Sequence, residues 1–471
     1  MNPLVLPDTE YKAVFERITQ LALEYLASIG ERPTFPKRTG SETEALFAKP
    51  LPEHGMGEDA LDNLRQLIES IRVTGPRFFG YVLGSGEPIA AAADLLASVL
   101  NQNVTAWRSS PSALTIERVV VGWLAEAIGC GGFSGSLTGG GSSANLMGLA
   151  MAREARAPAN EIGARPGTIY ASDQVHMSIP KAIALLGIGR EHLRLIPCDD
   201  DFRIRVDLLR ASMERDLSAG LTPIAIVGSA GTVATGSIDP LLELAEIAHE
   251  SGAWFHVDGA YGALAAIAEP AKFAGLNQVD SLSLDPHKWL YQPLDCGCLL
   301  YRDAAAARRA FSHTGDYAKS LLDDPVEGFV FFEETIELSR RFRALKIWLS
   351  LRYHGLANFR EAIRDDLIHA KLLAGLITKQ PELELLAPVP LSAVCFRHRS
   401  QSDADRNSNG LNQEILQGVI RRGKVFLSNA TIHGKFALRA CIVNHRTTPN
   451  DIEQVVSEVL AVGRELSAGV G

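Results

Sequence analysis

The sequence predicts an α/β fold in which helices cover both faces of a mainly parallel sheet. From about residue 90, short apolar or β-branched runs alternate with helical segments, which is the pattern of such a fold. Polar side chains follow several of these runs, and ligands of parallel sheets bind beyond the carboxyl ends of the strands. The expected strands are Gly167–Ser172, Leu193–Pro197, Pro223–Gly228, Ala253–Asp258, Ser281–Leu284 and Gly297–Tyr301, and the helices between them include Val206–Leu217 and Pro240–Ser251.

The segments on either side of this pattern are expected to form smaller parts. A helix is predicted from Asp8, its expected cap, to Gly30, and its one apolar stripe must be buried on the main body or on a second subunit. Residues 33–52 contain four prolines and are expected to run as an extended arm. A long helix is predicted over Ala344–Tyr353, followed by alternating helices and strands. The expected parts are an N-terminal helical arm over residues 1–85, a large domain over 86–355 and a small C-terminal α+β domain over 356–471.

The composition argues against several classes of protein. The chain has 471 residues, of which 46% are hydrophobic, and its formal net charge of −9 argues against a nucleic-acid partner. No apolar run approaches the roughly 20 residues that span a membrane, and the N-terminus lacks the basic and apolar regions of a signal peptide. The six cysteines are scattered without metal-ligand spacing, so no metal site is expected. These features predict a soluble cytoplasmic protein.

Two polar residues at expected strand ends are the first candidates for chemistry. Lys288 lies in the polar segment Ser283–Trp289, where the pattern suits either a solvated lysine in a turn or a Schiff-base lysine. A Schiff-base lysine needs a reactive neutral amine, which burial beside apolar surface favours. Asp258 ends an apolar run, where it either caps the following turn or faces a buried cation.

A glycine-rich turn and a histidine complete the candidate set. The segment Leu137–Asn145 places three glycines before a predicted helix, whose first N–H groups favour a phosphate. The segment also matches a dinucleotide-binding pattern loosely, but no acidic residue closes a second strand about 20 residues later. His176 follows an expected strand, where it is either a structural residue or one that stacks on a flat ring and transfers protons.

Taken in order, these motifs resemble those of the group II pyridoxal-5′-phosphate (PLP) decarboxylases, which include aromatic-L-amino-acid, histidine and glutamate decarboxylases. The resemblance covers about residues 76–446. The motifs that carry it are Ser110–Glu117, Gly140–Asn145, His176, Gly231-Thr232, Asp258, Asp285–Leu290 and Ser339–Lys346. It implies the fold type I of PLP-dependent transferases, with a seven-stranded sheet in the large, PLP-binding domain. It also implies a homodimer with a shared active site, in which the N-terminal arm packs on the partner subunit.

The resemblance assigns roles to individual residues. Lys288 is expected to bind PLP as an imine, Asp258 to pair with the pyridine nitrogen, and His176 to stack on the ring. Tyr317, on a loop after the lysine, is expected to protonate the substrate carbon after CO2 has left. The catalytic set is thus Lys288, His176, Tyr317 and Asp258. The expected cofactor-binding residues are Gly141, Ser142, His176, Thr232, Asp258, Ala260, Asp285, His287 and Lys288.

The expected reaction is decarboxylation of an L-amino acid to its amine, and an aromatic substrate is favoured. The resemblance places the substrate pocket at Phe79, Tyr81, Val82, Leu83, Asn103 and Thr105. Arg77 and Arg108 keep an acidic substrate, glutamate or aspartate, as an alternative. An aldehyde synthase on the same scaffold is a second alternative, against which Tyr317 weighs because such relatives tend to carry phenylalanine there. A catalytically silent PLP-binding scaffold protein is a third.

Overall fold

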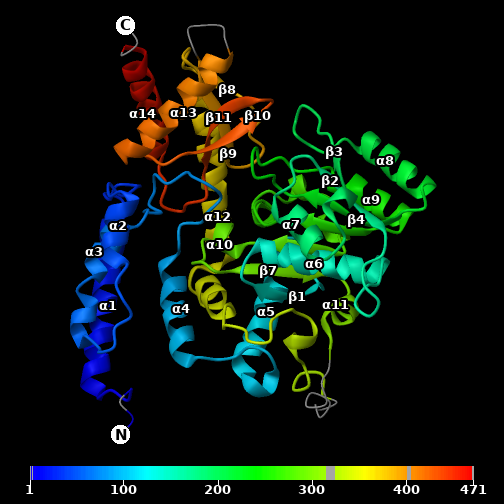
Figure 1. Cartoon of the computed structure of the whole chain (residues 1–471), viewed down its shortest axis with the longest axis horizontal. Helices are drawn as coiled ribbons and strands as arrows, with labels where there is room; N and C mark the ends of the chain where they lie inside the picture. The colour runs from blue at the N-terminus through cyan, green and yellow to red at the C-terminus, as the bar shows by residue number, and fades with distance from the viewer. Residues whose placement is uncertain (1, 3, 314–323, 400–404, 469–471) are drawn as a thin grey trace.

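One mixed sheet organises the molecule (Figure 1). The computed structural model describes residues 2, 4–313, 324–399 and 405–468. In these residues, seven strands form the large sheet in the order β1-β7-β6-β5-β4-β2-β3. The strands are β1 Ser134–Thr138, β2 Gly167–Ser172, β3 Leu193–Ile196, β4 Thr222–Ser229, β5 Trp254–Asp258, β6 Ser281–Leu284 and β7 Gly297–Tyr301.

The sheet is parallel except at one strand. Strand β7 runs antiparallel to both of its neighbours, β1 and β6, whereas the remaining neighbours pair in parallel. The α/β class, the seven strands and the mainly parallel sheet are therefore confirmed. All six strands expected from residue runs are present, but β1 was not among them. Its sequence, Ser-Gly-Ser-Leu-Thr, has few of the bulky β-branched or aromatic residues that mark a strand.

Helices cover both faces of the sheet, as predicted, because alternate strand residues point to opposite sides. On β4, Ile226 belongs to the apolar cluster that contains residues of α5, α8 and α9, whereas Val227 belongs to the cluster that contains residues of α6, α7 and α11. The helices that surround this sheet are α4 Pro88–Leu100, α5 Pro111–Ala127, α6 Gly141–Arg156, α7 Ser178–Leu185, α8 Val206–Ser218, α9 Leu241–Ser251, α10 Pro286–Trp289 and α11 Ala304–Phe311.

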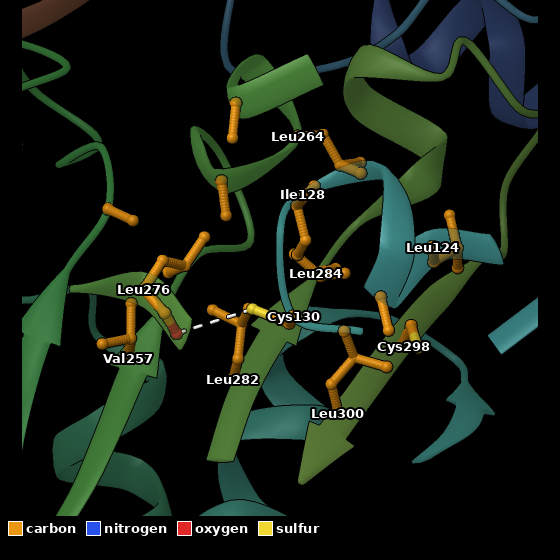
Figure 2. Packing of buried hydrophobic residues seen from close by; sticks show 14 of the residues in the cluster. Leu124, Ile128, Cys130, Val257, Leu264, Leu276, Leu282, Leu284, Cys298 and Leu300 are labelled. Carbon is orange, nitrogen blue, oxygen red and sulfur yellow. Dashed lines mark hydrogen bonds between the residues drawn. The ribbon is translucent and has the colours of Figure 1, made fainter. Parts of the chain in front are cut away.

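The face that carries α5 contains the largest apolar core, part of which is shown in Figure 2. Leu282 and Leu284 of β6 pack there with Cys298 and Leu300 of β7. Cys130 lies among them and its Sγ donates to the Leu276 carbonyl at 3.5 Å. Burial raises the pKa of this thiol to about 11, so it stays protonated at neutral pH.

A second, four-stranded antiparallel sheet lies near the C-terminus, in the order β10-β11-β9-β8. Its apolar core also receives Phe79 from the N-terminal third of the chain. The Phe79 N–H donates to the Phe426 carbonyl at 2.9 Å, and the Phe79 carbonyl accepts from the Cys441 N–H at 2.8 Å. The elements of this region are α12 Ala344–Thr378, β8 Leu383–Leu385, β9 Ala393–His398, α13 Asp405–Arg422, β10 Ser428–Ile432, β11 Lys435–Cys441 and α14 Pro449–Ala468.

Helix α12 connects the two sheets and is kinked at Gly355. This residue has φ 75° and ψ 151°, a conformation that favours glycine, and helical backbone continues on both sides. The helix expected over Ala344–Tyr353 is therefore the first half of α12. The kink lies next to the expected boundary between residues 355 and 356. The division of the chain into three domains remains a prediction.

The N-terminal arm differs from the expectation in two respects. Helix α1 (Asp8–Ser28) begins after Pro7 and has no side-chain cap, so the expected capping role of Asp8 is wrong. The proline-rich stretch is not a continuous extended arm, because it contains α2 (Gly40–Phe47). Thr39 and Glu42 form a capping box that stabilises this helix, a signal that the sequence did contain.

Helix α1 lies apart from the large sheet, beside α3 (Leu64–Ser70), to which an ion pair between Glu24 and Arg65 joins it at 2.9 Å (Figure 1). Tyr11, Phe15 and Ile18 are each more than 40% exposed on this helix. Of the expected apolar stripe, Leu21 is buried and Val14 and Tyr25 are half-buried, so the described residues cover the stripe only in part. None of the helices described is both long and apolar enough to cross a bilayer.

A buried carboxyl group joins α12 to the second sheet and predicts how stability varies with pH. Asp366 accepts hydrogen bonds from the Tyr291 hydroxyl at 2.8 Å and the Asn444 N–H at 3.2 Å. Burial raises the pKa of Asp366 to about 8, whereas the pKa of an aspartate in an unfolded chain is about 3.9. Between those values the folded chain keeps a proton that the unfolded chain releases, so stability falls as the pH rises.

We expect Asp366→Asn to remove this contribution. Urea unfolding from pH 5 to pH 8 should show the wild type losing up to about 1.4 kcal/mol more per pH unit than the variant. The difference between the two slopes should vanish below about pH 4, where the carboxyl group carries a proton in both the folded and the unfolded chain. Parallel curves for the two proteins over the whole range would contradict the prediction.

Candidate active site

Lys288 lies directly after β6, in the short helix α10, and its ammonium group is held by a buried acid. Its Nζ atom is 2.9 Å from Oδ2 of Asp285, whose side chain is 5% exposed. His287 Nε2 lies 3.6 Å from the same oxygen. Because a buried cation needs a partner, Asp285 fixes the position of the amine at the carboxyl edge of the sheet.

Asp258 ends the neighbouring strand β5, so both groups lie at one edge of the sheet. Three donors hold its carboxylate: the Asn145 amide reaches Oδ2 at 3.0 Å, and the Ala260 N–H and the Ser283 hydroxyl reach Oδ1 at 3.2 and 3.1 Å. Asp258 pairs with Ser283 in the parallel ladder between β5 and β6. This register brings Asp258 and Lys288 to the same cavity, although they are far apart in sequence.

The glycine-rich turn between β1 and α6 lies opposite these residues. Gly140 has φ 145°, a value that few other residues adopt. A Cβ atom on Gly141 would lie 2.7 Å from the Cβ of Ala260, so a side chain at this position would need the neighbouring strand end to shift. The turn opens α6, whose first backbone N–H groups favour an anion.

Two polar clusters complete the rim of the cavity. His176 follows β2, and its Nδ1 atom lies 2.8 Å from the Ser178 hydroxyl. Burial lowers the pKa of His176, although the nearby Asp258 opposes part of that effect. Thr232 is 3% exposed and its hydroxyl accepts from the Ser237 N–H at 3.1 Å, so this side chain stabilises the turn in which it lies.

A buried ion pair holds the end of β1, which leads into the glycine turn. Arg340 pairs with Glu117 of α5, and both side chains are fully buried. Glu117 also accepts from the Leu137 N–H at 2.9 Å, while Arg340 donates to the Leu137 carbonyl at 2.9 Å. Two motifs that are distant in sequence thus hold both backbone groups of Leu137, two residues before Gly139.

Lys288, Asp258, His176, Thr232 and the glycine turn line one cavity of about 330 Å³. All nine residues expected to bind the cofactor line it, whereas their individual roles remain predictions. The structure adds Gly139, Gly140, Ser143, Asn145, Ser229, Gly231, Val233, Tyr261 and Leu294 to the lining. The volume lies within the range of about 300–1,000 Å³ typical of small-molecule sites.

The residues expected to form the substrate pocket are not part of this lining as the described residues form it. Phe79 is fully buried in the core of the second sheet and is therefore not positioned to line the cavity. Tyr81 is 51% exposed and packs on Phe78, whereas the Asn103 side chain accepts from the Arg340 N–H at 2.8 Å. Val82, Leu83 and Thr105 are half-buried outside the cavity. Tyr317 lies outside the described residues.

Asn145 ends the expected phosphate-binding turn, but no role was expected for its side chain. The structure places its amide at the centre of the site, where it donates to both Asp258 and Ser178. No sequence pattern could reveal these contacts, because they join α6 to β5 and to α7 across the sheet edge. Leu294, which also lines the cavity, lies in an irregular segment without a motif.

Comparison with known proteins identifies the family. Residues 41–399, which are more than half of the chain, match the family model described as the pyridoxal-dependent decarboxylase conserved domain. The chain belongs to the pyridoxal-dependent decarboxylase family. The aromatic-L-amino-acid decarboxylase of Bacillus atrophaeus is 32% identical to this decarboxylase-family chain over 472 residues, which cover 98% of both proteins.

Two further relatives of this family member are informative. The 4-hydroxyphenylacetaldehyde synthase of Rhodiola rosea is 31% identical over 96% of this chain and 94% of its own length. The crystal structure of Oryza sativa TDC with PLP and tryptamine superposes with a TM-score of 0.92. It is 26% identical and covers 99% of both chains.

The residues present in this decarboxylase-family cavity fit PLP, the cofactor of the family. An amine, a carboxylate held by three donors and a glycine turn that opens a helix line one cavity. Oδ1 of Asp285 is buried without a hydrogen-bond partner among the described residues, and it lies close to the glycine turn. A buried polar atom without a partner is expected where a bound group completes the site.

Proposed function

We propose that this protein uses PLP, held by Lys288, to decarboxylate an aromatic L-amino acid to its amine and CO2. One observation carries the proposal: Lys288, Asp258 and the glycine turn surround a single cavity in a chain of the pyridoxal-dependent decarboxylase family. PLP supplies a conjugated electron sink, which makes the bond between Cα and the carboxylate of an amino acid easier to break.

The side chains of the cavity position the cofactor and determine the charge around it. Lys288 supplies the amine that holds the cofactor, and Asp285 keeps this amine at the cavity. Asp258 presents a fixed negative charge that stabilises a proton on the pyridine nitrogen. His176 is neutral at pH 7 because burial lowers its pKa, so it offers a flat uncharged ring and one N–H group.

An aromatic substrate is favoured over an acidic one. Arg77, which could have attracted an acidic side chain, donates instead to the Gly30 carbonyl at 2.7 Å, and neither Arg77 nor Arg108 lines the cavity of the described residues. The match over nearly the full length to an aromatic-L-amino-acid decarboxylase supports the same choice. The substrate pocket at Tyr81, Val82, Leu83, Asn103 and Thr105 is part of this proposal, with Asn103 and Thr105 contributed by the partner subunit.

The protein also acts as a simple decarboxylase in this proposal, although aldehyde synthases are among its relatives. Tyr317 supports this choice, because a phenolic hydroxyl can return a proton to the substrate carbon, whereas phenylalanine cannot. Tyr317 belongs to the proposal through its sequence alone.

The test is a screen of the twenty L-amino acids with the PLP-loaded enzyme. CO2, amine, aldehyde and hydrogen peroxide are measured separately for each substrate. We expect tryptophan, tyrosine or phenylalanine to give amine and CO2 in equal amounts, and Tyr317→Phe to shift the product towards aldehyde. Release of CO2 from glutamate or aspartate alone, or aldehyde as the main wild-type product, would replace the proposal by one of its alternatives.

The active enzyme is a homodimer in this proposal. Tyr11, Phe15 and Ile18 on α1 are exposed, and Leu96 and Val99 on α4 are 48% and 58% exposed. Apolar side chains gathered on two helices favour burial against another surface, and a two-fold pair is the commonest way to achieve it. A second copy of the chain would supply matching faces to both helices.

A further inference from the structure

A chain of buried hydrogen bonds leads from the interior of the sheet to Asp258. The Trp254 indole N–H donates to the Ser281 hydroxyl at 2.8 Å, and this hydroxyl lies 2.8 Å from His256 Nδ1. His256 Nε2 lies 2.9 Å from Oδ1 of Asn145. The Asn145 amide nitrogen then reaches Oδ2 of Asp258 at 3.0 Å.

The direction of each hydrogen bond follows from the two ends of the chain. At one end, the indole N–H can only donate, so the Ser281 oxygen accepts from it. Since Ser281 is fully buried and His256 Nδ1 is the one other hydrogen-bond partner of its hydroxyl among the described residues, the hydroxyl hydrogen points to that nitrogen. His256 therefore carries its hydrogen on Nε2 and donates it to Asn145. At the other end, a carboxylate can only accept, which requires the amide nitrogen of Asn145 to face Asp258. Both ends thus impose the same direction.

A second series of hydrogen bonds branches at Asn145 and reaches His176, and its donors and acceptors can be assigned in the same way. Asn145 uses its second amide hydrogen on the Ser178 hydroxyl, at 2.9 Å. The Ser178 backbone N–H donates to His176 Nδ1 at 3.3 Å, which makes this nitrogen an acceptor, so the Ser178 hydroxyl also directs its hydrogen there, at 2.8 Å. Two donors aimed at Nδ1 leave only Nε2 of the neutral ring to carry a hydrogen.

We propose that Asn145 is a positioning residue, oriented from Trp254 through Ser281 and His256, that fixes Asp258 as an acceptor and confines the proton of neutral His176 to Nε2. The inference rests on the proposed function in one respect: it assigns these two residues to the cofactor cavity. It adds a device that acts through four residues, Trp254, Ser281, His256 and Asn145, of which only Asn145 reaches the cavity.

The charges around the chain are compatible with this arrangement. Burial lowers the pKa of His256 to about 4, so this ring is neutral at pH 7 and can accept at one nitrogen while it donates at the other. The charged groups that face His176 are Asp258, Lys288, Asp285 and Lys181. None of these groups donates to Nδ1, so the serine branch alone decides the position of the hydrogen.

Nitrogen NMR on the ¹⁵N-histidine-labelled, PLP-loaded protein reads the proposal directly. His176→Gln and His256→Gln spectra assign the two rings by the signals that disappear. At pH 7 we expect each ring to show an unprotonated Nδ1 and a protonated Nε2. A protonated Nδ1 on His176 or on His256 in the wild type would overturn the proposal.

Two variants separate the branches. Asn145→Asp has nearly the same shape but cannot donate to Asp258 or Ser178 in its charged form. We expect it to weaken PLP binding about tenfold to hundredfold and to give His176 a mixed protonation pattern. Ser178→Ala should change the His176 signals alone and alter the apparent Kd for PLP less than about threefold. An unchanged Kd and an unchanged His176 spectrum in Asn145→Asp would overturn the proposal.

A tryptophan pair tests the distant end of the chain. Trp254→Phe keeps an aromatic ring in the core but removes the donor, and we expect a second signal from His256 to appear. Trp123 lies on α5 and takes no part in this series of hydrogen bonds. Trp123→Phe is therefore the matched control and should leave the His256 signals unchanged. The NMR spectra and the PLP affinity need no substrate, so they test the role of Asn145 even if the amino-acid screen contradicts the proposed reaction. Conversely, a protonated Nδ1 on His176 would contradict this inference without changing which product the enzyme releases.

Discussion

Lys288→Ala is expected to lower the rate of CO2 release by at least about a thousandfold, the largest effect of any single substitution in this protein. The substitution removes the amine that holds the cofactor, and groups that act as one catalytic unit lose nearly all activity when one of them is removed. It also leaves the buried Asp285 carboxylate without its nearest cation. The measurement combines single-turnover CO2 release with the visible absorbance of the PLP-loaded protein, which should lose its imine band.

A nearby lysine provides the control for this experiment. Lys181 lies on α7, close enough to influence His176, but its side chain is exposed. Lys181→Ala should keep the imine band and at least about half of the activity. Retention of the imine band in Lys288→Ala would show that another amine holds the cofactor and would overturn the assignment of Lys288.

Arg340→Met is expected to destabilise the fold by about 3–5 kcal/mol, because it leaves the buried Glu117 carboxylate without a cation. The substitution should also weaken PLP binding, since Glu117 and Arg340 together hold the strand that leads into the glycine turn. Urea unfolding measures the stability and titration with PLP measures the cofactor affinity, and we expect both to fall.

The adjacent residue offers a matched control for Arg340. The Arg341 side chain is 54% exposed and pairs with Asp295 at 2.8 Å, so Arg341→Met should cost less than about 1 kcal/mol. The double variant Arg340→Met with Glu117→Leu removes both charges and should recover part of the stability that the single variant loses. Equal losses in Arg340→Met and Arg341→Met would show that burial of the pair has no energetic effect.

The sequence predicted most of the large sheet because its strands are short, apolar and separated by helices. The bounds of β2, β6 and β7 agree with the expectation residue for residue. Strand β1 escaped prediction since Ser134–Thr138 has only one bulky apolar residue, and it is defined instead by its pairing with β7. Pairing between strands that are distant in the chain leaves no periodic trace in the sequence.

The candidate site was predictable to the extent that strand ends meet at one edge of a parallel sheet. This rule and the family motifs placed Asp258, His176 and Lys288 near one another. The chain from Trp254 to Asn145 was not predictable, because it depends on rotamers and on contacts between α6, β5 and β6. The expected pocket residue Phe79 failed to reach the cavity because the core of the second sheet buries it.

The position of Phe79 also constrains how the chain can fold during synthesis. Its ring fills a core whose other members come almost entirely from residues 370–462, so nearly three hundred residues must leave the ribosome before that core can close. Until then the Phe79 side chain has no native neighbours in that core. The C-terminal region, expressed without the first eighty residues, would therefore carry an open gap in its own interior.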